Sequence, residues 1–211
     1  MDANLHFVET KRLERIKQNL ERNNINTILL ETAAEVVPLL QSLLPKGASI
    51  SNGGSITLQQ CGVTDLLRSG DYQYLDREAP GADRIAIGHQ SFTVDYYLAS
   101  ANAITEAGEI YAIDGIGNRI AALAFGPERV ILVAGCNKIV PDIAAARARN
   151  TAISGPANAH RVGAAQSPCV STGFCSDCRS DTRICNMELV LRHQREAKRV
   201  TLILVNESLG Y

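Results

Sequence analysis

Short aliphatic runs alternate with helical stretches over the first 150 residues, and this alternation restricts the fold more than any other feature of the chain. Thr27 to Leu30 and Ala48 to Ser51 are typical of short strands, and Arg129 to Ala134 is aliphatic after its first residue. Strands that alternate with helices favour a largely parallel sheet covered by helices. The sequence therefore predicts an α/β fold with such a sheet.

Periodicity and turn signals predict the remaining elements of this part. Thr32 and Glu35 stand at the spacing of a capping box, which predicts a helix start at Thr32. Expected helices are 7–22, 32–44, 56–68, 117–125 and 141–150; expected strands are 27–30, 48–51, 72–75 and 129–134; and 102–105 with 109–114 form a hairpin. Residues 76–91 are expected to be irregular, and 93–99 fit either a strand or a short helix.

The composition changes after residue 150. Residues 151–186 are rich in Ser, Ala, Gly, Cys and Asn and show little periodicity. Residues 188–193 and 200–206 are apolar or alternating and flank a charged turn, which predicts a terminal antiparallel hairpin. The expected organisation is an α/β ligand-binding domain over 1–150, followed by a cysteine-rich metal-binding segment and hairpin over 151–211 packed on the same domain.

Composition excludes several classes of partner. The 211 residues carry a formal net charge of −1 and 45% hydrophobic residues, so the charge balance favours neither a nucleic-acid nor a membrane surface. With no Trp and four Phe, the core must be mainly aliphatic. The N-terminus lacks the apolar core of a signal peptide, and no apolar run reaches the ~20 residues of a membrane span. We therefore expect a cytoplasmic protein.

Four cysteines fall within 17 residues, Cys169, Cys175, Cys178 and Cys185, with the spacing C-x5-C-x2-C-x6-C. Thiolates gathered by a loop are typical ligands of zinc or of an iron–sulfur cluster. In a reducing cytosol, a metal site is favoured over a disulfide or free thiols. Cys61 and Cys136 lie far upstream and are not counted as ligands.

A glycine-rich turn follows the second expected strand. Its candidate ligand-binding residues are Asn52, Gly53, Gly54, Ser55 and Thr57. Ligands bind at the carboxyl edge of a parallel sheet, and free N–H groups at a helix start favour an anion such as phosphate or carboxylate. The alternative is a tight turn in which Ser55 only caps the helix.

Two further clusters are expected at the same edge. Asp114, Asn118 and Arg119 flank a Gly-x-Gly turn, and Arg119 suits bidentate binding of an anion unless it only pairs with Asp114. Asn137 and Lys138 follow the strand 129–134, where Lys138 either completes an anion site or is a solvated surface lysine.

Three sequence strings resemble the lactate-utilisation (LUD) domain family. They are SNGGS at 51–55, ANAITEAG at 101–108 continuing to DGIGNR at 114–119, and GCNKIV at 135–140. Together with the cysteines, they are most similar to short, cysteine-tailed members. The family is similar in fold to the sugar-phosphate isomerase and CoA-transferase superfamily, which implies a Rossmann-like sheet. It also adds Asn102 as a candidate ligand-binding residue.

The resemblance implies possible chemistry without defining a reaction. A glutamate in a comparable place is catalytic in that superfamily, so Glu106 is the candidate catalytic residue, the alternative being an exposed charge at the hairpin turn. Some family members are tied to lactate oxidation through iron–sulfur proteins. That link, and the irregular cysteine spacing, favour a [4Fe–4S] cluster over zinc.

Three functions remain open from the sequence. The first is an iron–sulfur protein of lactate or related 2-hydroxy-acid utilisation, with a pocket for a small carboxylate or phosphorylated metabolite. The second is an isomerase- or transferase-like enzyme that uses Glu106 and carries a structural zinc. The third is a non-catalytic accessory subunit of an iron–sulfur oxidoreductase. The edge of the expected terminal hairpin would allow pairing in a homo-oligomer.

Overall fold

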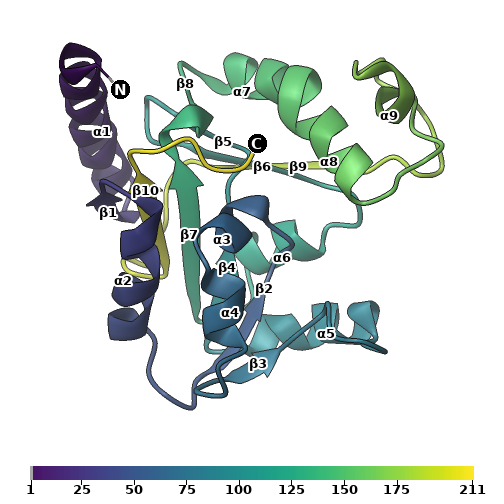
Figure 1. The fold of residues 1–211 in the computed structure, drawn as a ribbon, viewed down its shortest axis with the longest axis horizontal. Helices are drawn as coiled ribbons and strands as arrows, with labels where there is room; N and C mark the ends of the chain where they lie inside the picture. The colour runs from purple at the N-terminus through teal and green to yellow at the C-terminus, as the bar shows by residue number, and fades with distance from the viewer. Residues whose placement is uncertain (1) are drawn as a thin grey trace.

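Six parallel strands form the central sheet of the molecule (Figure 1). The computed structural model describes residues 2–211 and gives the strand order β1-β10-β7-β4-β2-β3, with every neighbouring pair parallel. The strands are β1 (Asn26–Leu30), β2 (Ser49–Asn52), β3 (Gln73–Leu75), β4 (Tyr96–Ala99), β7 (Arg129–Gly135) and β10 (Val200–Val205). The predicted α/β fold is confirmed.

Helices cover both faces of this sheet, as the side chains of β7 demonstrate. Val130, Leu132 and Ala134 belong to the hydrophobic core that includes residues of α1, whereas Ile131 and Val133 belong to the core on the opposite face. Successive side chains of a strand point to opposite faces, so an unbroken aliphatic run is buried on both. The covering helices are α1 (Ala3–Arg22), α2 (Val36–Leu43), α3 (Ile56–Gln60), α4 (Val63–Leu67) and α6 (Asn118–Ala124). Helix α5 (Arg84–Gln90) follows β3 and contributes no buried residue.

A second, mixed sheet lies beside the first, with the order β8-β5-β6-β9. Its strands are β5 (Ala103–Thr105), β6 (Ile110–Asp114), β8 (Ile139–Val140) and β9 (Met187–Leu191). The expected hairpin is confirmed, because β5 and β6 pair antiparallel. The helical run α7 (Ile143–Arg149), the π-helical turn Asn150–Ser154 and α8 (Gly155–Arg161) follows β8, and α9 (Pro168–Thr172) precedes the cysteine-rich loop.

The predicted terminal hairpin is wrong. Strand β9 pairs antiparallel with β6 in the second sheet. Strand β10 instead enters the central sheet between β1 and β7, parallel to both. From residue 200 to 205 the chain is almost continuously apolar, which suits a central parallel strand buried on both faces better than one strand of a half-exposed hairpin.

Three other expectations also need correction. The single helix expected over 56–68 is two helices, because Gly62 adopts a left-handed backbone with φ of 72° between them. The region expected to be irregular contains α5, whose first turn is capped by Asp83 Oδ1 accepting from Ile85 N and Ala86 N at 3.0 Å. The helix expected to end at residue 150 continues as the π-helical turn and α8.

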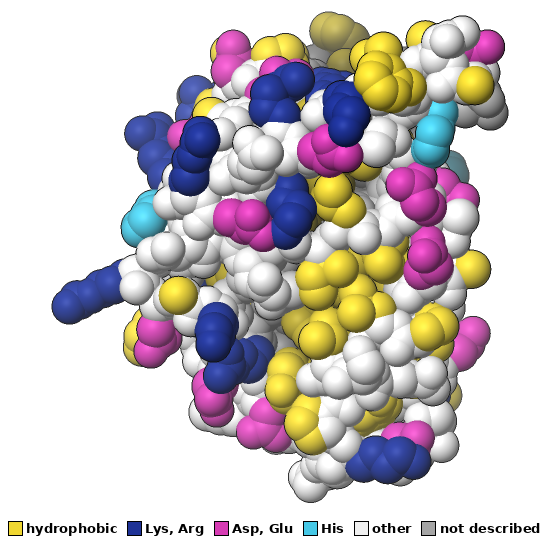
Figure 2. Space-filling model, turned by 90° about the vertical axis from the view of Figure 1, so that its left-hand side faces the viewer, with side chains coloured by type: hydrophobic (Ala, Val, Ile, Leu, Met, Phe, Trp, Pro, Cys, Tyr) yellow, Lys and Arg dark blue, Asp and Glu magenta, His cyan; other side chains and the backbone are white. Residues whose placement is uncertain are grey.

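The face that carries α1 and α2 is shown in Figure 2. Lys and Arg side chains are mixed with Asp and Glu over this face, and hydrophobic side chains gather near its middle. Within residues 2–211, no helix is long and apolar enough to cross a membrane.

Candidate functional site: a cationic pocket beside a cysteine segment

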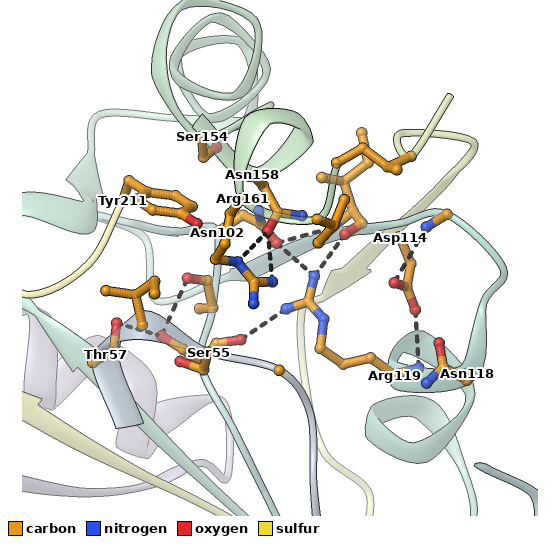
Figure 3. Close-up of a pocket in the computed structure, with 18 of the residues that line it drawn as sticks. Ser55, Thr57, Asn102, Asp114, Asn118, Arg119, Ser154, Asn158, Arg161 and Tyr211 are labelled. Atoms are coloured by element: carbon orange, nitrogen blue, oxygen red, sulfur yellow. Dashed lines mark hydrogen bonds between the residues drawn. The ribbon is translucent and has the colours of Figure 1, made fainter. Parts of the chain in front are cut away.

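A pocket of about 540 Å³ opens at the carboxyl ends of the central strands (Figure 3). The chain passes from β2 to β3 on one side of the pocket and from β4 to β7 on the other side. The connections between strands therefore run in opposite directions on either side of the gap between β2 and β4. Such a switch point is where open α/β sheets bind ligands. Eight of the predicted residues line the pocket: Gly54, Ser55, Thr57, Asn102, Asp114, Asn118, Arg119 and Lys138.

The glycine-rich turn packs against the side chain of Arg119. Ser55 Oγ accepts a hydrogen bond from Leu58 N at 3.2 Å, so Ser55 is the N-cap of α3 as well as a pocket residue. A Cβ atom on Gly53 would lie 3.1 Å from Arg119 Cδ and from Tyr97 Oη. Glycine at position 53 therefore lets the turn pack directly against the Arg119 side chain.

Arg119 is held in place by oxygen atoms that carry no net charge. Its guanidinium donates to Ser100 O at 2.8 Å, to Ile113 O at 2.6 Å and to Asn102 Oδ1 at 2.8 Å. Asp114 instead caps α6, because its Oδ2 accepts from Arg119 N at 2.9 Å and from Ile120 N at 3.2 Å. The Arg119 side chain is thus rigidly oriented, and its charge is not neutralised by Asp114.

Lys138 is the most unusual group in the pocket. Its side chain is buried, and Nζ donates to Thr57 Oγ1 and Ser100 Oγ, both at 2.8 Å. Burial, with smaller contributions from the charges of Arg149 and Arg119, lowers the pKa of Lys138 to about 7. The alternative of a solvated surface lysine is therefore wrong.

The charges around the pocket favour an anionic ligand. The lining contains five cationic side chains, Arg77, Arg84, Arg119, Lys138 and Arg161, against two acidic ones, Glu78 and Asp114. Among residues 2–211, no carboxylate forms a salt bridge with any of these five. Uncompensated positive charge in a concave site attracts anions and is suited to binding carboxylate or phosphate.

Four predicted residues do not line this pocket. Asn52 Oδ1 accepts from Tyr74 Oη at 2.7 Å, and Gly53 packs behind Arg119. Asn137 donates to Gly210 O at 3.1 Å and accepts from Leu209 N at 3.1 Å, so it positions the last residues of the chain. Glu106 is described next.

Glu106 lies on the side of the second sheet that faces α1. Its carboxylate accepts from Arg12 Nε at 3.1 Å and lies 3.5 Å from Arg15 Nη2. Asn19 donates to its carbonyl oxygen at 2.7 Å. These contacts join the β5–β6 turn to α1, and they pair the Glu106 carboxylate with two arginines outside the pocket.

The four clustered cysteines surround one small cavity. Cys169, Cys175, Cys178 and Cys185 all line it, together with residues of the π-helical turn and α8. Burial, together with the nearby charges of Cys175 and Cys178, raises the pKa of Cys169, and burial also raises the pKa of Cys185. Within residues 2–211, no three Cys, His, Asp or Glu side chains converge as ligands of a single ion. The four cysteine thiols therefore line a common cavity but do not converge on a single point.

Arg183 organises this cysteine segment, defined here as residues 169–185. Its guanidinium donates to the carbonyl oxygens of Cys178 and Cys185 and pairs with Asp177 at 2.8 Å. Arg183 lines the same cavity as the four cysteines, so its charge would also offset the charge that the thiolates acquire on binding a metal.

The cysteine segment and the pocket share a wall. Ile184 lines both cavities, and the π-helical turn contributes Ser154 to the pocket and Asn150 to the cysteine cavity. A Cβ atom on Gly115 would lie 3.3 Å from Ile184 Cα, so the end of β6 packs closely against the segment. π-Helical turns are frequent at functional sites.

Several pocket residues were missed from the sequence. Ser100 follows the last residue of β4, a position that marked the predicted residues of the other strands. Arg161 and Asn158 lie on α8, in a stretch without clear periodicity, and Tyr211 approaches from the segment after β10. No local signal places these three beside Ser55.

The fold and site define a class: a parallel α/β protein with a cationic pocket at the switch point of its sheet. The chain belongs to the LUD domain family, whose profile matches residues 13–205. This family is linked to lactate utilisation.

A solved structure has the same fold. It is a DUF162 family protein from Deinococcus radiodurans with 15% identity and a TM-score of 0.51, and the match covers 94% of this chain and 98% of that chain. At this identity the likeness describes the fold alone. A search of curated proteins finds no match.

Proposed function

We propose that this protein binds a [4Fe–4S] cluster through Cys169, Cys175, Cys178 and Cys185 and a small carboxylate or phosphorylated metabolite in the adjacent pocket. Its role would be the utilisation of lactate or a related 2-hydroxy acid. The observation that carries the proposal is the shared wall: Ile184 lines both the cysteine cavity and the cationic pocket. A bound cluster would supply an electron acceptor beside the bound acid.

The choice of a cluster over zinc rests on the irregular cysteine spacing, C-x5-C-x2-C-x6-C, and on the family's link to lactate utilisation. The four cysteines line a common cavity, which is consistent with their binding one metal group. The pocket's part of the proposal is supported by its five cations against two carboxylates.

The test is purification without oxygen, followed by measurement of iron, sulfide, zinc and the visible spectrum. We expect about four iron and four sulfide per chain and broad absorption near ~400 nm, as thiolate-bound clusters give. Cys178→Ser should abolish both. Cys136→Ser is the matched control, because Cys136 lies outside the cysteine cavity and should leave them unchanged. One zinc without colour would overturn the cluster assignment.

A further inference from the structure

Within residues 2–211, Lys138 forms no salt bridge with a carboxylate. Its side chain is 2% exposed, and the charged groups that face it are Arg119 from α6 and Arg149 from α7. Cys61, at the end of α3, has a pKa raised to about 11 by burial, so it is neutral near pH 7. A buried cation that faces two other cations and no anion is costly to keep charged.

The hydroxyl groups around Lys138 are oriented to accept hydrogen bonds from it. Ser100 Oγ donates to Val133 O at 2.6 Å, and Thr57 Oγ1 donates to Leu209 O at 3.3 Å. Each hydroxyl has one proton, so both oxygens present lone pairs to Nζ. Two of the three ammonium hydrogens are thereby used, which leaves one for a ligand in the pocket that Lys138 lines.

We propose that Lys138 is the anchor for the anionic group of the ligand, and that the protein takes up a proton at Lys138 when the anion binds. This inference rests on the proposed function, because it specifies how the same pocket recognises the anionic group of its ligand. The ligand supplies the negative charge that no carboxylate among residues 2–211 provides to Lys138. Above about pH 7 the free protein then avoids a buried, uncompensated cation, whereas the complex contains an ion pair.

The chemical class of ligand follows from this arrangement. The bound group must be a full anion, because a neutral carbonyl or hydroxyl would leave the ammonium uncompensated. Arg119 lies on the same lining and adds attraction for a second oxygen of a carboxylate or phosphoryl group. A neutral analogue of the same size, such as an amide in place of the carboxylate, should therefore be rejected.

The test is isothermal titration calorimetry with L-lactate and with sulfate, which stands in for a phosphoryl group. Neither probe titrates between pH 6 and 9, so proton exchange reports on the protein. Each titration is repeated in two buffers with different ionisation enthalpies. We expect uptake of about one proton near pH 8.5 and much less near pH 6, with affinity falling roughly tenfold per pH unit above 7.

Variants separate this role from a structural one. Lys138→Met should abolish both the binding heat and the proton uptake while the protein still unfolds cooperatively. Lys46→Met is the control, because Lys46 is exposed at the opposite end of β2 and should change neither. Binding of lactate without sulfate would show that Lys138 selects carboxylates. Binding of sulfate without lactate would show that it selects phosphoryl groups.

Binding of either anion without proton uptake near pH 8.5, or no binding of either, would overturn the proposal. Failure here is distinct from failure of the cluster assignment, which iron and sulfide content decide independently. The wild-type measurement of proton uptake also holds if the Lys138→Met chain does not fold.

Discussion

The pocket and the cysteine segment are neighbours, but they are built in opposite ways. Pocket groups such as Arg119 and Lys138 are held by hydrogen bonds to backbone and hydroxyl oxygens at the strand ends. Residues 173–186 contain no helix or strand, and their main internal tie is Arg183. The comparison indicates that the pocket is organised before its ligand arrives, whereas on the proposed cluster assignment we expect the segment to take its order from bound metal.

The largest expected effect tests that dependence. Removing metal with a chelator should expose the cysteine segment to trypsin, which can cut after Arg179 and Arg183. Because residues 173–186 contain no helix or strand and open at little cost, we expect cleavage there to accelerate about tenfold or more, while the sheets resist. Mass spectrometry of the fragments measures this. Equal cleavage with and without metal would contradict a metal-dependent segment.

A second prediction concerns the stability of the pocket without ligand. The pKa of Lys138 is lowered to about 7 in the folded protein, below its ordinary value of 10.5. The unfolded chain therefore holds the proton more tightly, and the cost of the buried charge is present in full below about pH 7 and is relieved as the pH rises toward 10.5.

Lys138→Met should thus stabilise the ligand-free protein, by several kcal/mol at pH 6 and by less at pH 9. Urea unfolding at the two pH values measures the difference. Lys46→Met should show no such dependence on pH, because Lys46 is exposed. A destabilised Lys138→Met protein at pH 6 would show that the lysine is charged and compensated in the free state.

A substitution at Gly210, which packs against the pocket residues Thr57 and Lys138, should have a smaller effect on stability. The φ of Gly210 is 58°, and a Cβ atom there would lie 2.5 Å from Thr57 Oγ1 and 3.5 Å from Lys138 Nζ. Gly210→Ala should lose about 1–2 kcal/mol of stability for the left-handed backbone and weaken lactate binding about tenfold by displacing Thr57.

Gly47 is the matched control for this substitution. It has a φ of 81° and no atom within 4 Å of its would-be Cβ. Gly47→Ala should therefore lose similar stability and leave lactate affinity unchanged in calorimetry. Equal affinities for the two variants would show that the segment after β10 does not shape the pocket.

The sequence was sufficient for the local elements of the fold and insufficient for one long-range pairing. Aliphatic runs and turn residues predicted β1, β2 and β7, because such strands are recognisable from their own composition. The place of β10 depends on β1 and β7, which lie far away in sequence, and nothing within 200–206 states that it enters between them. A nearby apolar run at 188–193 made the hairpin the simpler local interpretation.

The site divides in the same manner. Ser55, Arg119 and Lys138 were predictable because each follows a strand whose carboxyl end meets the others at one sheet edge. Arg161 reaches that edge only because the helical run from α7 continues through the π-helical turn into α8, where the composition predicted irregular chain. The surroundings of Glu106 could not be predicted, since its partners Arg12 and Arg15 belong to a helix about ninety residues upstream.

The smallest expected effect lies at the junction of the two regions. Asn186 Nδ2 donates to Gly115 O and to Arg183 O, both at 3.0 Å, and so ties the cysteine segment to the end of β6. The side chain is exposed, so water can replace these bonds, and Asn186→Ala should cost only about 0.5–1 kcal/mol.

Asn186→Ala should leave both iron content and lactate affinity within about twofold, because the backbone bond from Asn186 N to Asp114 O at 2.8 Å remains. Asn186→Asp is the companion variant, since it keeps the shape but replaces the two donated hydrogen bonds with repulsion between oxygens. Metal analysis and calorimetry on both variants measure the outcome. If Asn186→Ala lost iron, the order of the cysteine segment would come from the α/β domain through this junction, and the contrast between a preorganised pocket and a metal-ordered segment would fail.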